Sequence, residues 1–147
     1  MGTTKVKEII KNLEKIRDNK GNKYVIDSKS PIYNYEFAFH VPDADIKRHG
    51  AVVIKSKDPK YNYLFARNID GADVMCHGEA VIASKDPKYN YLFAMNIEEA
   101  NVVEHRKVLL STNDEGMKQD FLSDELLNER YENSIIKNKI LSLSKGN

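Results

Sequence analysis

Cysteine and tryptophan are almost missing from this chain: Cys76 is the only cysteine among 147 residues, and there is no tryptophan. One thiol excludes an intramolecular disulfide and a cysteine-based zinc site, and it is typical of a reducing compartment. No apolar run approaches the roughly 18 residues of a membrane-spanning helix, and no signal peptide precedes the first charged segment. We therefore expect a cytoplasmic protein without membrane partners.

Motifs that carry catalysis are missing too. The sequence has no nucleophile elbow, no Gly-rich phosphate loop, and neither an HExxH nor a CxxC motif. Cys76 and His77 are neighbours on a predicted helix, so they face different ways and form no catalytic dyad. The sequence therefore predicts a non-enzyme that needs no cofactor and no metal.

The net charge is only +1, but it is unevenly distributed. Residues 1–60 hold 13 basic and 8 acidic side chains, whereas residues 61–147 hold 10 and 14. An acidic stretch can contact a basic partner, although a solvated helix face is the commoner meaning. The candidate acidic patch consists of Asp120, Asp124, Glu125 and Glu129.

What the chain does contain is an internal repeat. Ser56–Ala66 reads SKDPKYNYLFA, and the same letters return 28 residues later at Ser84–Ala94. A weaker copy, SKSPIYNYEFA, begins at Ser28, and a decayed one, TNDEGMKQDFL, begins at Thr112. Self-similarity at this period indicates a stacked repeat array, and such arrays usually present surfaces to partners.

Each unit reads as two helices, A and B. Asp58 followed by Pro59 is a helix start signal, and Tyr61, Leu64, Phe65, Asn68 and Ile69 fall on one arc of helix A. After the Asp70–Ala72 turn, Asp73 caps helix B, which runs to about Ser84. Its apolar arc contains Val74, His77, Gly78, Val81 and Ile82.

These patterns predict an all-α fold: a short, right-handed α-solenoid of stacked helical hairpins that forms a single domain over residues 1–147. The repeats span about 28–55, 56–83 and 84–111. A capping helix is expected over residues 4–18 and a C-terminal cap over 112–143, with a break near Asn133–Ser134 and a frayed tail from Ser144. Asn19–Asn22 is expected to be a turn.

Histidines recur at one place in helix B, as His49, His77 and His105. One interpretation is a metal or catalytic histidine; the other is a structural histidine, partly buried, that bonds a backbone group or a tyrosine hydroxyl. Equivalent positions in stacked helices lie on the order of 10 Å apart, too far for one metal. We therefore favour the structural interpretation.

Paired tyrosines recur in helix A. The first of each pair belongs to the hairpin core, so the second must form a ladder along the array, flanked by Asn34, Asn62 and Asn90, which we expect to bond within it. The ladder either packs between adjacent A helices or forms an exposed ridge that anchors a partner. It consists of Tyr35, Tyr63 and Tyr91.

The outer arc of helix B varies while its core repeats, which is where repeat proteins usually place recognition; mere surface drift is the alternative. The predicted partner-binding residues beside the tyrosines are Arg48, Arg67, Met75, Glu79 and Glu104. A helical repeat can also read RNA, with Tyr63 stacking and Asn62 bonding a base edge. No continuous basic face is evident in the sequence, so nucleic acid, RNA or DNA, is the less favoured partner.

The unit DPxYNYxFAxxIxxA(D/N)V resembles tandem helical repeats in uncharacterised proteins of phages and AT-rich bacteria, over roughly residues 28–122. Ser30 replaces the capping Asp in the first copy, and the fourth keeps only Asp114 and Phe121. Small phage proteins without enzymatic motifs are often inhibitors of host defence, including anti-CRISPR proteins. The resemblance thus implies an inhibitor that acts by steric occlusion in the host cytoplasm.

The leading hypothesis is therefore a non-catalytic protein–protein binding module. Two alternatives stay open: a nucleic-acid-binding repeat protein, and a homo-oligomer, such as a homodimer, joined through the apolar helices of residues 121–141.

Overall fold

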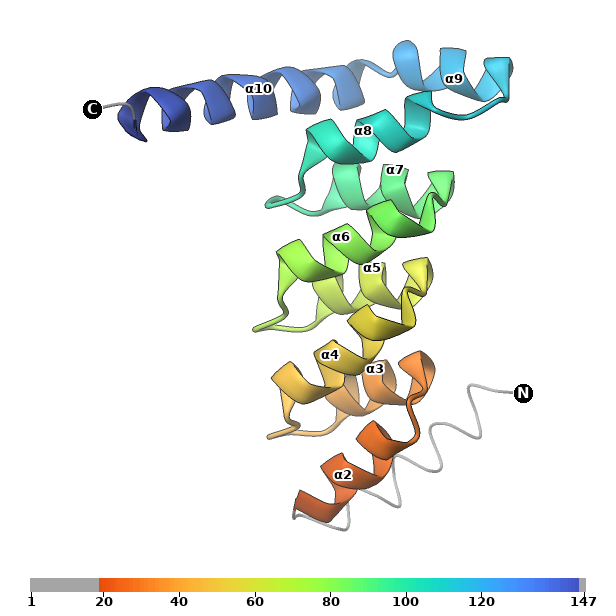
Figure 1. Cartoon of the computed structure of the whole chain (residues 1–147), viewed down its shortest axis with the longest axis vertical. Helices are drawn as coiled ribbons and strands as arrows, with labels where there is room; N and C mark the ends of the chain where they lie inside the picture. The colour runs from red at the N-terminus through yellow and green to blue at the C-terminus, as the bar shows by residue number, and fades with distance from the viewer. Residues whose placement is uncertain (1–18, 146–147) are drawn as a thin grey trace.

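The computed structural model describes residues 19–145, and within them every regular element is a helix (Figure 1). The predicted capping helix over residues 4–18 lies outside the described residues. The elements are α2 (Asn19–Asp27), α3 (Pro31–His40), α4 (Ile46–Ser56), α5 (Pro59–Asn68), α6 (Val74–Ser84), α7 (Pro87–Asn96), α8 (Val102–Leu110), α9 (Glu115–Leu122) and α10 (Glu125–Lys145).

The predicted hairpins are present and form a stack. Helices α3, α5 and α7 are the A helices, each paired with the B helix that follows it, α4, α6 or α8. Successive A helices contact each other, and so do successive B helices, beginning with α2. The A-to-B loops lie along one edge of the stack and the B-to-A turns along the opposite edge (Figure 1). The fold is therefore a short α-solenoid, as the repeat predicts.

Capping side chains start the helices where the sequence indicates. Asp58 is the N-cap of α5 and accepts the Tyr61 N–H at 3.0 Å, with Pro59 in the first turn. Asp73 caps α6 by accepting the Cys76 N–H at 3.1 Å. The same positions cap the flanking repeats, through Ser30, Asp45, Asp86 and Asn101.

Segment α2 corrects the turn expected at Asn19–Asn22, because these residues begin a helix. The segment occupies the place of a B helix, with Gly21 and Val25 buried against the first hairpin. The order of equivalent positions explains this, since Asn22 and Val25 stand where Gly50 and Val53 stand in the next repeat. Packing against α3 and α4 thus overrides the turn-like composition of the segment.

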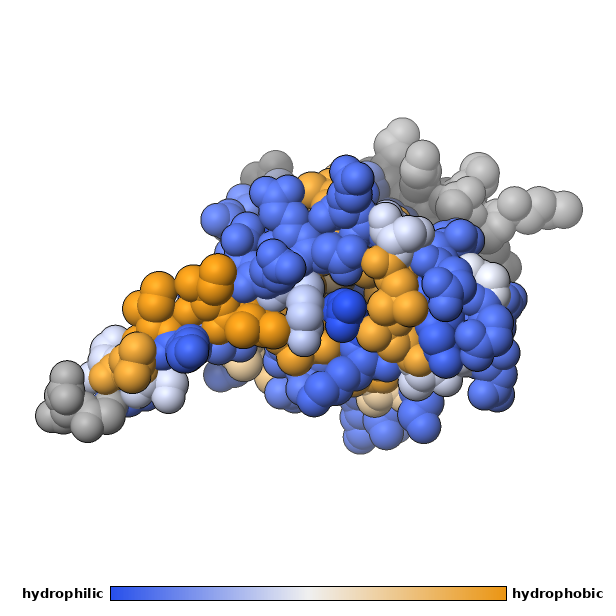
Figure 2. Space-filling view, turned by 90° about the horizontal axis from the view of Figure 1, so that it is seen from above, coloured by the Kyte–Doolittle hydropathy of each residue, from blue (hydrophilic) through white to orange (hydrophobic). Residues whose placement is uncertain are grey.

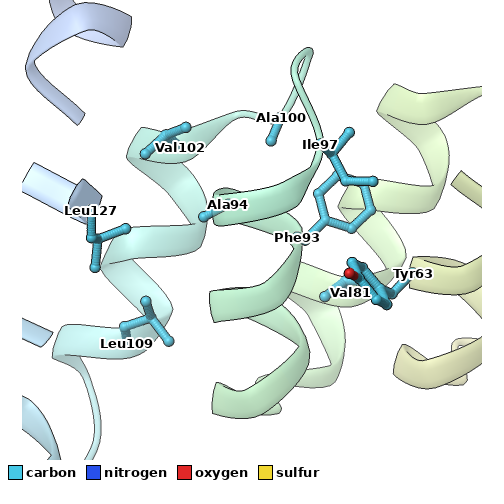
Figure 3. Close-up of a cluster of buried hydrophobic side chains, with 9 residues drawn as sticks. All are labelled: Tyr63, Val81, Phe93, Ala94, Ile97, Ala100, Val102, Leu109 and Leu127. Atoms are coloured by element: carbon cyan, nitrogen blue, oxygen red, sulfur yellow. The ribbon is translucent and has the colours of Figure 1, made fainter. Parts of the chain in front are cut away.

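The core is continuous from hairpin to hairpin. Its largest cluster runs from Tyr63 on α5 to Leu127 on α10 (Figure 3). Phe37, Phe65 and Phe93 occupy one equivalent position and are at most 2 % exposed. Gly50 and Gly78 allow the helices to approach closely, since a Cβ there would lie 3.3 Å from the ring of Phe65 or 3.2 Å from that of Phe93.

A buried Asn–His pair crosses each hairpin. In the central repeat, Asn62 Nδ2 donates to the carbonyls of Val53, at 2.9 Å, and Asp58, at 2.7 Å. Its Oδ1 must then accept from His77 Nδ1 at 2.8 Å, so the hydrogen of the neutral ring lies on Nδ1. The His77 ring also stacks on Phe65, with centroids 4.7 Å apart. The same arrangement recurs as Asn34–His49 and Asn90–His105.

This network corrects two expectations. The histidines are fully buried rather than partly buried, and their partner is an asparagine side chain, not a backbone group or a tyrosine. The asparagines accordingly do not bond within the tyrosine ladder. Within residues 19–145, no three His, Cys, Asp or Glu side chains come close enough to hold a metal ion. The histidines therefore belong to the structural framework.

The C-terminal cap departs from the array. The chain breaks at Ser123 and Asp124 rather than at Asn133–Ser134, because Asp124 caps α10 by accepting the Leu127 N–H at 2.9 Å. The helix then runs unbroken through Ser144 to Lys145, so the expected fraying at Ser144 is wrong. Helix α10 packs across α7 and α8, where Leu127 is fully buried.

Two arginines fasten α10 to the last hairpin. Arg130 donates to the carbonyls of Ala94 and Ile97, at the end of α7, the latter at 2.8 Å. Arg106 on α8 lies under the Tyr131 ring, 4.1 Å from its centroid. The first half of α10 is therefore firmly held.

Replacing Asn62, the asparagine of the central repeat, should lower the stability of the stack. In Asn62→Ala, the buried His77 Nδ1–H loses its partner. The carbonyls of Val53 and Asp58 each lose one bond and keep only those from the Ser56 hydroxyl and from the N–H of residue 62. We therefore expect a loss of about 3 kcal/mol in unfolding free energy. Urea denaturation measures it. The matched control is Asn138→Ala, an exposed residue of α10 whose side chain forms no hydrogen bond within the described residues; it should change stability by less than about 0.5 kcal/mol. Equal effects of the two substitutions would contradict the role of the network.

Acid should destabilise the fold through the same histidines. Burial lowers the pKa of His49, His77 and His105 from 6.5 to about 4. Below pH 6.5 these histidines become protonated in the unfolded chain, whereas in the folded chain they stay neutral down to about pH 4. The free energy of unfolding therefore falls as pH drops through this window. Each ring accounts for up to about 3 kcal/mol. Urea unfolding at pH 7.5, 6 and 5 tests this, and a free energy that stays constant over that range would refute it.

Candidate protein interface

The tyrosine ladder is packed between repeats, so the exposed-ridge alternative is wrong. Tyr35 and Tyr63 are only 7 % and 3 % exposed. Asn68 donates to the Tyr35 hydroxyl at 2.9 Å, and Asn96 donates to the Tyr63 hydroxyl at 3.0 Å. Asn68 was expected on the buried arc of helix A; it is instead exposed and holds the neighbouring tyrosine. These two tyrosines fix the register between A helices and are not free to anchor a partner.

Tyr91 ends the ladder in a different way. It is half-buried, its ring stacks on Phe121 at 5.8 Å, and its hydroxyl donates to Asp124 at 2.7 Å. Asp124 stands one repeat after Asn96, so a carboxylate takes the place of the amide. The Leu127 N–H, followed by the Tyr91 hydroxyl, lowers the pKa of Asp124. Within the predicted acidic patch, Asp124 is thus a structural residue.

The other members of the acidic patch lie on the surface. Asp120 lies in the last turn of α9, and Glu125 and Glu129 lie on the first half of α10; all three side chains are exposed. They give this end of the array its negative charge. Their role as a contact for a basic partner stays a prediction.

The predicted residues of the helix B arc are also on the surface, with mixed chemistry. Met75 is 70 % exposed, and Arg48 and Glu79 are exposed with it. Glu104 is half-buried and bonds Lys107 at 2.9 Å. Arg67, on helix A, is exposed and lies 6.0 Å from the centre of the Tyr63 ring. No single charge or apolar character unites these positions, and their binding role stays a prediction.

A second surface was missed by the sequence reasoning, although its signal was in the repeat. Each B-to-A turn reads Ser-Lys-Asp-Pro or Ser-Lys-Ser-Pro. In the central turn, the Ser56 hydroxyl donates to the Val53 carbonyl at 2.6 Å and accepts the Asp58 N–H at 3.2 Å. The Lys57 N–H bonds the Ile54 carbonyl at 3.1 Å. These bonds force the lysine between them into a left-handed conformation.

The lysine is strained in the same way in every turn. Lys29, Lys57 and Lys85 have φ values of 55°, 58° and 59°. A residue with a Cβ in this region costs about 1–2 kcal/mol, which is why glycine or asparagine usually ends a helix in this way. All three side chains are exposed, and within the described residues none of them forms an ion pair.

Two further lysines extend this surface. Lys60 and Lys88, in the first turns of α5 and α7, are exposed, and their ammonium groups lie 5.5 Å and 5.4 Å from the rings of Tyr61 and Tyr89. The turns they flank lie above one another along one side of the stack (Figure 1). We call this surface the lysine edge; it consists of Lys29, Lys57, Lys60, Lys85 and Lys88.

The lysine edge stops at the fourth repeat. The positions equivalent to Lys85 and Lys88 are Asn113 and Gly116, and two carboxylates, Asp114 and Glu115, lie between them. The carboxylates of Asp58 and Asp86 cap their helices, and Asp114 caps α9 in the same way by accepting the Met117 N–H at 3.0 Å. The array therefore has a basic face over three turns, which corrects the expectation that no such face follows it, whereas the fourth turn has lost both lysines and gained Glu115.

No family model, no curated protein and no solved structure matches this chain. Among residues 19–145, no helix is both long enough and apolar enough to cross a membrane. The candidate interface thus rests on the geometry of the surface.

Proposed function

We propose that the protein is a non-catalytic module that binds an acidic surface of another protein along the lysine edge. The observation that carries this proposal is the repeated left-handed lysine. Backbone strain of this kind persists where the surrounding structure enforces it, and it gathers at functional sites. Glycine at Lys29, Lys57 and Lys85 would relieve the strain, yet all three turns keep a charged side chain that is exposed and unpaired among the described residues.

The spacing of the edge supports a protein partner. Helices α2, α4 and α6 pack side by side, so their C-terminal lysines recur at about the 8–10 Å of packed helices. A partner helix advances about 10.5 Å over seven residues, so acidic side chains one heptad apart would meet successive lysines. An acidic helix laid along the array thus has the complementary period.

Nucleic acid fits less well. The charged backbone of a nucleic acid would extend beyond the three lysine turns, since duplex DNA carries a phosphate charge about every 1.7 Å along its axis. Such a polyanion would run into Asp114 and Glu115, which follow the edge in the fourth repeat. The edge also uses lysine throughout, whereas arginine is the better bidentate phosphate ligand.

A module of this kind would act by covering a surface. The array brings no chemistry of its own to the lysine edge, so its effect on a partner would be steric. This is also how an inhibitor of a host defence protein, suggested by the repeat resemblance, would act.

Replacing the strained lysines by glycine should raise the stability of the fold but weaken binding to an acidic partner. In Lys29→Gly/Lys57→Gly/Lys85→Gly, we expect unfolding free energy to rise by about 1 kcal/mol in 0.5 M salt, where attraction between lysines and helix ends is screened. Binding to a helical peptide with glutamates every seven residues should weaken about tenfold, because three exposed ion pairs are lost. Denaturation and fluorescence anisotropy measure the two effects.

The control removes the same charge elsewhere, in Lys47→Gln/Lys107→Gln/Lys145→Gln, three exposed lysines away from the lysine edge. This variant should bind the peptide as the parent does. Equal losses in both variants would mean that only net charge matters. Tighter binding of single-stranded RNA than of the peptide would move the proposal to nucleic acid.

A further inference from the structure

Helix α10 is longer than the array can cover. Its 21 residues span about 30 Å, and its second half projects beyond the edge formed by the A-to-B loops (Figure 1). Ile136, Ile140 and Leu143 on this half are 56 %, 60 % and 68 % exposed. So many solvent-exposed apolar side chains on one helix indicate a surface that contacts a partner.

The helix has two different faces. Leu127, Arg130 and Tyr131 face α7 and α8. Further along, the array side borders a groove of about 320 Å³ lined largely by polar groups, to which α10 contributes Arg130, Asn133, Ser134, Lys137 and Asn138. The opposite face carries Ile136, Ile140 and Leu143, whereas the exposed Ile135 and Leu141 lie off it. Figure 2, which looks down on α10 from the side away from the array, shows apolar side chains along the projecting part.

This outer face follows a heptad pattern. Residues every three and four positions share one stripe of a helix and form the seam of a coiled coil. The a and d positions of the outer face, in chain order, are Leu126, Glu129, Asn133, Ile136, Ile140 and Leu143. All six are exposed, and the last three form a continuous apolar seam over the projecting half.

We propose that this seam pairs with the seam of a second copy, as a parallel two-stranded coiled coil. Asn133 stands at an a position, where a single asparagine favours a parallel, in-register dimer. Glu132 and Lys137 take g and e positions, so in a parallel pair each glutamate would meet Lys137 of the second copy. The charges therefore favour this pairing.

An antiparallel pair is disfavoured by the same charges. Setting Ile136 opposite Ile140 of the second copy brings Lys137 and Lys139 of the two chains together. No acidic residue lies between Asn133 and the end of the chain to compensate. Like charges placed face to face oppose that arrangement.

The array leaves room for the parallel dimer. Because the apolar part of the seam, Ile136, Ile140 and Leu143, lies outside the groove beside α8, the two arrays would stand on opposite outer sides of the paired helices, related by a two-fold axis. Asn133 borders that groove and is exposed, so it can still meet its counterpart at the start of the seam. Glu129 sits at a d position, where two carboxylates would face each other. The apolar contact is therefore confined to the projecting half, and replacing Glu129 by leucine should strengthen it.

Dimerisation goes beyond the proposed binding at the lysine edge and does not depend on it. If both hold, each dimer carries two lysine edges, and a partner with two acidic sites would be held by avidity. The mass of the protein alone tests the dimer, so its failure leaves the lysine edge untouched.

Sedimentation equilibrium of the full chain is the first experiment. We expect a concentration-dependent dimer that Ile136→Asp abolishes and that Glu129→Leu tightens. The matched control is Ile135→Asp, a neighbouring isoleucine that is 41 % exposed but lies off the seam, and it should leave the dimer intact. A monomer at all concentrations, or equal effects of the two aspartates, would overturn the proposal.

Cysteine cross-linking then tests the orientation. In a Cys76→Ser background, Asn133→Cys and Leu143→Cys should each form a disulfide-linked dimer, because equivalent a or d positions face each other only in a parallel pair in register. Asn138→Cys, on the same helix but off the seam, should not. A dimer in which Asn133→Cys or Leu143→Cys fails to cross-link would refute the parallel arrangement.

Discussion

The buried amide–imidazole pair is the constraint on which the stack depends. Asn62 touches three helices at once: it donates to the end of α4 and to the start of α5, and it accepts from His77 on α6. Since a buried polar group without a partner is costly, these bonds are satisfied together or not at all. The pair thus sets the position of each helix B against its own helix A and against the preceding repeat.

One equivalent position of the B helices distinguishes the interior of the stack from its two ends. It is occupied by Asn22, Gly50, Gly78 and Arg106 in successive repeats. The glycines let Phe65 and Phe93 approach, and within the described residues they leave His77 Nε2 and His105 Nε2 without a hydrogen-bond partner. At the first joint, the Asn22 side chain fills this space: its Oδ1 accepts the Asp45 N–H and lies 2.9 Å from His49 Nε2, which carries no hydrogen to donate while the neutral ring holds its hydrogen on Nδ1. At the last joint, Arg106 excludes close packing and meets Tyr131 of α10. At both ends of the array this position therefore carries a polar side chain, whereas in the interior it is a glycine.

The sequence predicts the helices well because their signals are local. Caps, prolines and apolar arcs lie within a few residues of one another, and the bounds of α5 and α6 follow from them. The contacts between repeats are not local: Tyr63 meets Phe93 and Asn96, which are 30 and 33 residues away. A helical wheel therefore placed Tyr63 opposite the hairpin core and Asn62 beside the tyrosine ladder, although both are buried. The left-handed lysines were missed because lysine is not a residue expected at positive φ. The continuity of α10 through Asn133 was missed because the effective cap, Asp124, is recruited by Tyr91 from another repeat.

Because the lysine edge repeats, an acidic partner helix could bind it in more than one register, and the C-terminal cap disfavours the shifted one. With equivalent lysines in successive turns, an acidic helix that matches one turn also matches the next, so it could slide along the array by whole repeats. The fourth repeat opposes this, because Asn113 and Gly116 stand where another lysine pair would be, with Asp114 and Glu115 between them. An acidic partner shifted by one repeat would place its charge against these carboxylates, which is specificity by repulsion rather than by added attraction. Loss of the lysine pattern in the decayed copy therefore fixes the register of the copies that keep it, and the same stretch then leads into the helix that leaves the array.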